Sequence, residues 1–141
     1  MTHILIVSSP YYKDISDALM AGATAACAEA GATYDVIEVP GAFEIPAAIS
    51  LALDDDKYDG FIALGCVIRG ETTHYDIIAN ESARGLMDLA IHDDACIGNG
   101  ILTVENYEQA QVRADVKHGN KGADAALACM RLIEIKKQFS S

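Results

Sequence analysis

Short apolar runs alternate along the chain with stretches in which apolar residues recur every three or four positions. The apolar runs predict four β-strands, at residues 4–9, 33–39, 59–68 and 96–103. The periodic stretches predict five helices, at about residues 15–30, 45–52, 76–92, 106–116 and 121–138. This alternation is typical of an α/β fold with a four-stranded parallel sheet and helices on both faces. Because the pattern is continuous, we expect residues 1–141 to form a single domain.

Three details of the pattern carry further expectations. The third run, "DGFIALGCVI" (59–68), is apolar almost throughout and predicts a strand buried on both faces. Within the fourth run, Asn99-Gly100 predicts an irregularity. The last helix has two apolar sides, of which we expect one to cover the sheet and the other to meet a neighbouring subunit. These sides are formed by Ala126, Leu127 and Met130, and by Leu132, Ile135 and Phe139.

Composition and charge narrow the class of protein. Of the 141 residues, 51% are hydrophobic, which is enough for one substantial core. The formal net charge of −11 argues against binding to nucleic acid or to an anionic membrane, and no apolar run could span a bilayer. The chain enters an apolar strand almost at once, so we predict no signal peptide and expect a cytoplasmic protein. Four cysteines without a CxxC motif are expected to be reduced core thiols: Cys27, Cys66, Cys96 and Cys129.

Unusual polar and aromatic residues gather where the predicted strands end. Ligands of an open parallel sheet bind beyond the carboxyl ends of its strands. Those ends are followed here by residues 8–14, 40–44 and 69–74, and by the stretch after Thr103. The loops contain two aromatic residues, two carboxylates and a histidine: Tyr11, Phe43, Glu44, Glu71 and His74. We therefore place a candidate site at this edge of the sheet.

The loop "RGETTH" (69–74) has the composition of an anion site. It leads into a helix, whose free backbone amides and dipole attract an anion. Gly70 permits close approach to the backbone, and Thr72 and Thr73 add hydroxyl donors. The loop lacks the lysine of a P-loop and the GxGxxG pattern, so neither a nucleoside triphosphate nor a dinucleotide is indicated. An ordinary helix-capping loop is the alternative interpretation.

Two kinds of side chain near this loop have chemistry of their own. His74 could transfer a proton, because an imidazole titrates near neutrality, although an exposed capping histidine is the alternative. Tyr11 and Phe43 could sandwich a planar ring, or they could simply pack within their loops. No other histidine has a comparable context, and no pair has metal-ligand spacing with cysteine or a carboxylate, so no metal site is predicted.

Other charged stretches are interpreted as solvent-exposed. Arg113 and Lys121 lie on either side of the break between the last two helices. An arginine can bind phosphate with two hydrogen bonds, but from the residues alone these two are typical of an exposed helix face. The acidic stretch "LDDDKYD" (53–59) precedes a strand instead of following one, and is interpreted as a solvated turn.

Three motifs in order, "VPGAFEIP" (39–46), "GCVIRGETTHYD" (65–76) and "NKG" (120–122), resemble those of the 6,7-dimethyl-8-ribityllumazine synthase family. The resemblance covers about Ile4 to Phe139. It implies condensation of 5-amino-6-(D-ribitylamino)uracil with 3,4-dihydroxy-2-butanone 4-phosphate, without a metal or organic cofactor. It also implies a flavodoxin-like three-layer α/β/α sandwich. Members form pentamers with active sites between adjacent subunits, and some assemble twelve pentamers into an icosahedral shell.

The resemblance also assigns roles to the residues of the phosphate end. The phosphate of the butanone is expected on Gly70, Glu71 and Thr72, with Arg113 as its ion partner. His74 matches the family's proton-transfer histidine.

At the other end, the resemblance implies a pocket for the ribityl-aminouracil. Ala42, Phe43 and Glu44 match the segment that holds this substrate, with Glu44 on the ribityl hydroxyls. Val67 and Ile68 match backbone contacts to the pyrimidine ring. The remaining matches are a stacking aromatic residue and a lysine supplied after the helix break: Tyr11 and Lys121.

Three departures from the family pattern bear on these expectations. Pro10-Tyr11-Tyr12 stands where Arg-Phe-Asn is common, so a tyrosine replaces an asparagine that can both donate and accept. Asn99 stands where many members place a phenylalanine that faces a neighbouring subunit's site. A strand that many members have before Ile4 is absent, which leads us to expect a pentamer and not a shell.

Two other functions are less consistent with the sequence. A flavin- or lumazine-binding protein on the same scaffold, with weak catalysis, has no need for His74 together with Arg113. An unrelated flavodoxin-like signalling module would need an acidic phospho-acceptor pocket at the first and third strand ends, and the sequence has none there.

Overall fold

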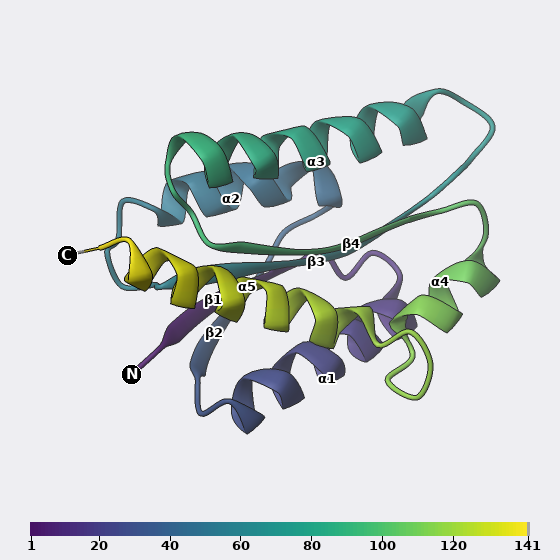
Figure 1. The fold of residues 1–141 in the computed structure, drawn as a ribbon. Helices are drawn as coiled ribbons and strands as arrows, with labels where there is room; N and C mark the ends of the chain where they lie inside the picture. The colour runs from purple at the N-terminus through teal and green to yellow at the C-terminus, as the bar shows by residue number, and fades with distance from the viewer. Residues whose placement is uncertain (141) are drawn as a thin grey trace.

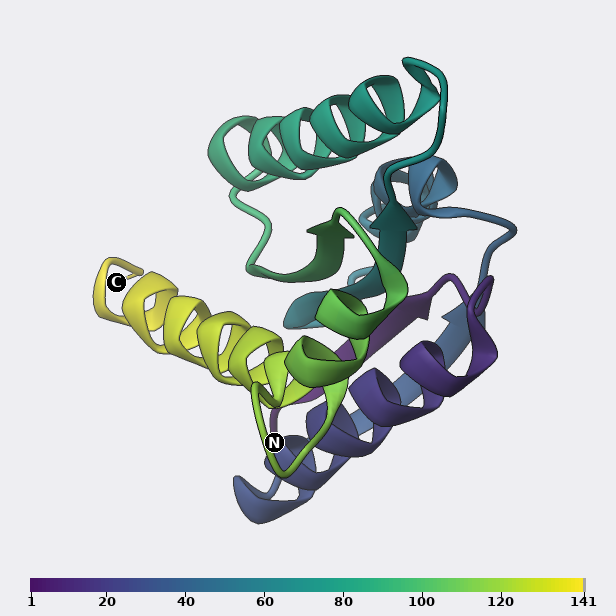
Figure 2. The ribbon, with the colours of Figure 1, turned by 90° about the vertical axis from the view of Figure 1, so that its right-hand side faces the viewer.

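The computed structural model describes residues 1–140 and forms an α/β sandwich around one parallel sheet (Figure 1). In chain order its elements are β1 (His3–Ser8), α1 (Lys13–Glu29), β2 (Thr33–Glu38), the 3-10 helix η1 (Ala42–Glu44), α2 (Ile45–Ala52), β3 (Gly60–Ile68), α3 (His74–His92), β4 (Ile97–Val104), α4 (Tyr107–Ala114) and α5 (Lys121–Gln138). The four strands lie in the order β2-β1-β3-β4. Helices α2 and α3 cover one face, and α1, α4 and α5 cover the other (Figure 2). The predicted flavodoxin-like architecture is confirmed.

The central strands are buried because their side chains are apolar on both faces. In β3, residues 60–65 are all buried, as the unbroken apolar run predicted. Alternate residues of the strand contribute to separate cores, with Ile62 and Leu64 on the α1 and α5 side and Phe61 and Ala63 on the α2 and α3 side. Helix α1 ends at Glu29, and Gly31 just beyond its C-cap has a φ of 76°, the left-handed conformation that terminates helices.

Helix α5 packs so close to β4 and to α1 that no large side chain fits at the points of contact. A Cβ atom on Gly98 of β4 would overlap the carbonyl of Ala125, and one on Gly122 would overlap the carbonyl of Leu19. The buried stripe of α5 therefore consists mostly of small residues: Gly122, Ala125, Ala126, Cys129 and Ile133. The prediction that Leu127 belongs to the covering side was wrong, because its side chain is 57% exposed.

The expected irregularity at Asn99-Gly100 is also absent. Strand β4 keeps its register with β3 through both residues, with Asn99 opposite Ala63 and Gly100 opposite Leu64. As an edge strand, β4 has outward-facing amides, and Asn99 Oδ1 accepts a hydrogen bond from the amide of Ile101 at 2.9 Å. The asparagine side chain thus gives the Ile101 amide a hydrogen-bond partner, and the strand remains continuous.

The remaining expectations about composition have mixed outcomes. Cys27, Cys96 and Cys129 are free and buried, as predicted, and burial raises the pKa of Cys129 to about 12. Cys66 is free but only partly buried. Residues 53–59 form the expected turn before β3, and the described residues contain no group of acidic, histidine or cysteine side chains that could hold a metal ion. None of the described helices is long and apolar enough to cross a membrane.

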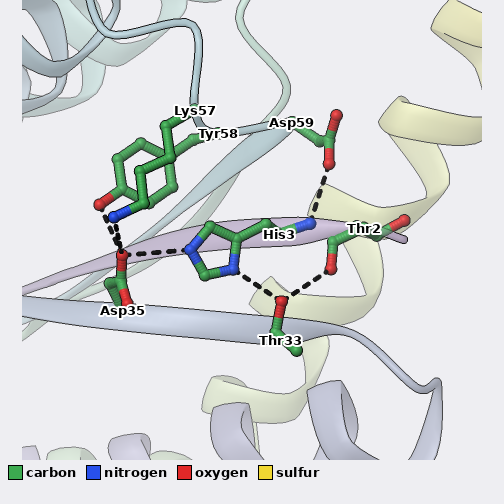
Figure 3. A network of polar contacts seen from close by, with 7 residues as sticks. All are labelled: Thr2, His3, Thr33, Asp35, Lys57, Tyr58 and Asp59. Carbon is green, nitrogen blue, oxygen red and sulfur yellow. Dashed lines mark hydrogen bonds and ion pairs between the residues drawn. The ribbon is translucent and has the colours of Figure 1, made fainter.

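A polar network ties the amino ends of β1, β2 and β3 together, at the edge opposite the loops discussed above (Figure 3). The ring of His3 lies 2.7 Å from Thr33 Oγ1 and 3.1 Å from Asp35 Oδ2. That carboxylate also accepts a hydrogen bond from Tyr58 at 2.8 Å and pairs with Lys57 at 3.1 Å. Sequence reasoning gave His3 no role, because its partners lie at least thirty positions away in the chain.

Substituting Asp35 by asparagine should lower the free energy of unfolding in a pH-dependent way. Hydrogen bonds from Tyr58, His3 and Lys57 hold the pKa of Asp35 at about 2, below its ordinary 3.8. A carboxyl group whose pKa falls on folding stabilises the protein above its unfolded pKa and loses that effect as the pH falls through the folded pKa. Urea unfolding should therefore show a deficit for Asp35→Asn near neutral pH that shrinks between pH of about 4 and about 2.

Asp54→Asn, in the exposed turn before β3, is the matched control and should show no such trend. A deficit for Asp35→Asn that stays constant across this pH range would contradict the role given to the network.

Candidate active site

A cavity of about 490 Å³ lies at the carboxyl edge of the sheet, between the loops after β1, β2 and β3 and the start of α3. Nine of the expected site residues line it: Tyr11, Ala42, Phe43, Glu44, Val67, Ile68, Gly70, Thr72 and His74. They come from three loops that are far apart in the sequence. The parallel sheet brings them together because it places the carboxyl ends of its strands at one edge.

Aromatic side chains form the mouth of the cavity. Tyr11 and Phe43 line it and remain 74% and 50% exposed, so a ring face of each is available to a ligand. Tyr12 stands edge-on to Tyr11, with ring centroids 4.9 Å apart, and approaches Tyr107 at 6.5 Å. Tyr12 packs against the core beneath α1 and α4. It therefore supports Tyr11 by packing and does not supply the paired polar groups of an asparagine.

The end of β3 contributes an apolar wall to the cavity. Val67 and Ile68 line it together with Cys66. Burial raises the pKa of the Cys66 thiol to about 11, so this group is neutral near pH 7 and is not a nucleophile. Sequence reasoning had placed Cys66 in the core and had missed Tyr12 as a lining residue. Both residues could have been found from the sequence, because each is adjacent to a predicted site residue near the end of a strand: Cys66 precedes Val67, and Tyr12 follows Tyr11.

Residues 70–74, which we call the cradle, connect this wall to the first turn of α3. Thr72 Oγ1 accepts a hydrogen bond from the amide of His74 at 3.2 Å, which leaves the hydroxyl proton of Thr72 free to donate. A Cβ atom on Gly70 would meet nothing within 4 Å, so the space above its backbone is open. The amides of the first turn of α3 lie next to this space. Together these groups can hold an anion by neutral donors and the helix dipole.

Two further residues of the cavity, His74 and Glu44, are accessible. His74 is exposed at the start of α3, and its ring has no hydrogen-bond partner within the part of the chain that the structure describes. Glu44 is exposed at the start of α2, and among the described residues it has no ion pair. Each can therefore meet a ligand without breaking an existing contact. His74 is the last residue of the cradle, so its imidazole could take a proton from a molecule bound there.

Four expected site residues do not line this cavity. Glu71 is exposed in the cradle but outside the lining, and Asn99 lines a separate hollow between β4 and α3. Arg113 is exposed in the last turn of α4, where its Nη1 donates to the carbonyl of Gln109 at 3.1 Å. Lys121 begins α5 and lies 3.6 Å from Asp124. None of the described residues that line the cavity is a lysine or an arginine.

Comparison with known proteins identifies the family of the chain. The family model for 6,7-dimethyl-8-ribityllumazine synthase matches residues 1–137. The chain is 57% identical to 6,7-dimethyl-8-ribityllumazine synthase 1 of Rhizobium meliloti (strain 1021), over 99% of this chain and 94% of that protein. It is 58% identical to the synthase of Agrobacterium fabrum, over 97% of this chain and 96% of that protein, and 54% identical to that of Zymomonas mobilis, over 99% and 100%. The chain therefore belongs to the 6,7-dimethyl-8-ribityllumazine synthase family.

Proposed function

We propose that the cavity at the carboxyl edge is where this enzyme condenses 5-amino-6-(D-ribitylamino)uracil with 3,4-dihydroxy-2-butanone 4-phosphate. The product is 6,7-dimethyl-8-ribityllumazine, and phosphate and water are released. Family membership supports the reaction. The observation that supports the location is the convergence of aromatic, acidic and cradle residues from three separate loops on one cavity. A free imidazole beside the cradle favours catalysis over binding alone.

The two ends of the cavity suit the two substrates. The exposed faces of Tyr11 and Phe43 match the flat pyrimidine ring, and the backbone at Val67 and Ile68 can meet its polar edge. Glu44 can accept hydrogen bonds from ribityl hydroxyls. At the other end, the open backbone at Gly70 and the amides before α3 match the phosphate. This arrangement holds the amine of one substrate near the ketone of the other.

Proton transfer is the chemical task that remains. An amine of the uracil attacks the ketone carbon, and loss of water gives an imine. Removal of the proton from the carbon next to the imine then drives out phosphate, which leaves with the electrons of its C–O bond. This elimination leaves an enol, which takes up a proton on its terminal carbon, loses the hydroxyl proton and becomes a carbonyl. Closure of the second amine onto that carbonyl releases a second water. We assign to His74 the assistance of the first attack and the removal of the proton as phosphate departs.

The cation for the phosphate is proposed to come from a neighbouring subunit. The cavity of one chain is lined by no lysine or arginine among the described residues, although it must hold a multiply charged anion against a net charge of −11. Arg113 and Lys121 are exposed and point their charges outside their own chain's cavity. A ring of subunits would place them, and Asn99 in the hollow between β4 and α3, against the next chain's site.

The assembly proposed is an isolated pentamer. Leu132 and Phe139 remain 38% and 85% exposed on the outer side of α5, which suits a subunit with partners. Five chains of 15.0 kDa give a mass of about 75 kDa. We also propose that residues 1–141 form one domain, and that the enzyme works in the cytoplasm, where its four free cysteines would stay reduced.

Incubating the protein with both substrates should produce the absorbance and fluorescence of the lumazine, and His74→Ala should slow this at saturating substrate. General acid–base assistance contributes ~10²- to 10⁴-fold, while proximity of the two substrates persists, so we expect a rate reduced within that range but not abolished. His92→Ala, at the other end of α3, is the matched control and should retain the wild-type rate. An unchanged rate for His74→Ala would remove this residue from the mechanism.

Arg113→Ala should raise the KM for the butanone phosphate and leave the KM for the ribityl-aminouracil nearly unchanged. Loss of a charge-assisted hydrogen-bonded pair costs about 1.5–3 kcal/mol, which corresponds to roughly a tenfold to hundredfold rise. Arg131→Ala, an exposed arginine of α5 that pairs with Glu134, serves as the control. Equal increases in the two Michaelis constants would show that Arg113 does not recognise the phosphate.

A further inference from the structure

Arg69 lies immediately before the cradle, yet its side chain does not face the cavity. Its backbone amide donates to the carbonyl of Val104 at 2.9 Å, which extends the pairing of β3 and β4 by one residue. Its side chain lines the neighbouring hollow that also contains Asn99. The phosphate and ring-binding roles described above therefore leave this residue without a function.

The guanidinium of Arg69 is held on three sides. Its Nε lies 2.7 Å from Oε2 of Glu105, in the loop before α4, and its Nη1 lies 3.4 Å from Oδ1 of Asp76, in the first turn of α3. Its central carbon lies 4.3 Å from the centroid of the Tyr75 ring. Because two carboxylates pair with this one cation, its charge is balanced locally and is not available to a ligand.

These contacts close the cradle at its base. Arg69 precedes residues 70–74, and Tyr75 and Asp76 follow them directly. A salt bridge between the two ends of such a short loop restricts where its amides can lie. His74 is the residue immediately before Tyr75, so the same contacts restrict the start of the helix that carries it.

The contacts of Glu105 continue towards Arg113. The amide of Glu105 donates to Oε1 of Gln109 at 2.8 Å, and the amide of Gln109 donates to the capping Asn106 at 2.9 Å. The carbonyl of Gln109 accepts from Nη1 of Arg113 at 3.1 Å. Arg69 thus connects the cradle to the beginning of the helix that carries Arg113.

We propose that Arg69 is a positioning residue for phosphate recognition, which fixes the cradle against the loop before α4 through Glu105 and Asp76. The proposal rests on the function given above, because that function places the phosphate on the cradle. Arg69 itself does not touch the substrate. Its effect is to hold the cradle amides and His74 in the geometry that the phosphate requires, so that binding does not have to order the loop.

A contribution to global stability is a weaker explanation of the same contacts. The side chains of Arg69, Asp76 and Glu105 are 42%, 49% and 60% exposed, and pairs this exposed add little to the free energy of unfolding. The hydrogen bond to Glu105 raises the pKa of Arg69, so the guanidinium stays charged throughout the usual pH range. An arginine can meet two carboxylates and an aromatic face at once, whereas a lysine offers one compact charge.

Arg69→Met, which keeps the length of the side chain and removes its charge, tests the proposal. We expect the KM for the butanone phosphate to rise roughly tenfold or more, because small displacements of a binding group have effects of this size. The inhibition constant of inorganic phosphate should rise in parallel, while the KM for the ribityl-aminouracil changes less than about twofold. Glu105→Gln should reproduce this pattern, and Arg69→Lys should recover part of the loss.

Arg84→Met is the matched control, since Arg84 also joins two carboxylates, Glu81 and Asp88, on the exposed side of α3. It should leave both Michaelis constants unchanged. Thermal unfolding and light scattering of each variant complete the comparison, and Arg69→Met should keep the wild-type melting temperature and mass. Unchanged phosphate constants, equal changes for both substrates, or a loss explained by unfolding or dissociation would each overturn the proposal. Failure of the wild-type protein itself to bind inorganic phosphate would instead overturn the cradle assignment, and the role of Arg69 with it.

Discussion

The parallel pairing around β3 is the constraint on which the site depends. Each pairing continues one residue beyond the strand: Ser9 donates to Leu64, Val39 to Ser8 and Arg69 to Val104, all at 2.9 Å. The loops that follow β1, β2 and β3 therefore start at fixed positions along one edge. Aromatic residues of the first two loops and the cradle of the third consequently face one cavity. The buried, apolar character of β3 fixes this arrangement, since a one-residue shift of register would move every core side chain of the strand to the opposite face.

Much of this could be predicted from the sequence, because it follows from local patterns. Periodicity identified every strand and α-helix, and the rule that ligands bind beyond the carboxyl ends identified the correct edge. What could not be predicted depends on close contacts between distant segments. The small residues of α5 are buried because Gly98 and Gly122 allow backbone approach, which hydrophobicity alone does not reveal. The partners of His3, and the support that Tyr12 gives to Tyr11, are likewise set by the fold.

Charge gives the site its second constraint. The chain is strongly acidic, and the arginine nearest the cradle is paired with two carboxylates. One subunit therefore offers an anion neutral donors and a helix dipole, but no unpaired cation in the cavity lining that the structure describes. Arg113 and Lys121 are exposed on the same chain but lie outside this cavity. The simplest arrangement that joins these two halves is one in which each chain completes the site of its neighbour, which makes activity a property of the assembly.

Mixing two impaired variants tests this shared site most directly. His74→Ala removes the proposed proton-transfer group, and Arg113→Ala removes the proposed phosphate cation. With the butanone phosphate well below its wild-type KM, neither homo-oligomer should turn over substrate well. If the two variants are unfolded together, refolded and confirmed as pentamers by light scattering, half of the chains carry each change. About a quarter of the interfaces should then combine an intact His74 with an intact Arg113, and the lumazine should form at about a quarter of the wild-type rate. If each chain held its own complete site, the mixed assembly would be no more active than the average of the two variants, and that result would contradict the account.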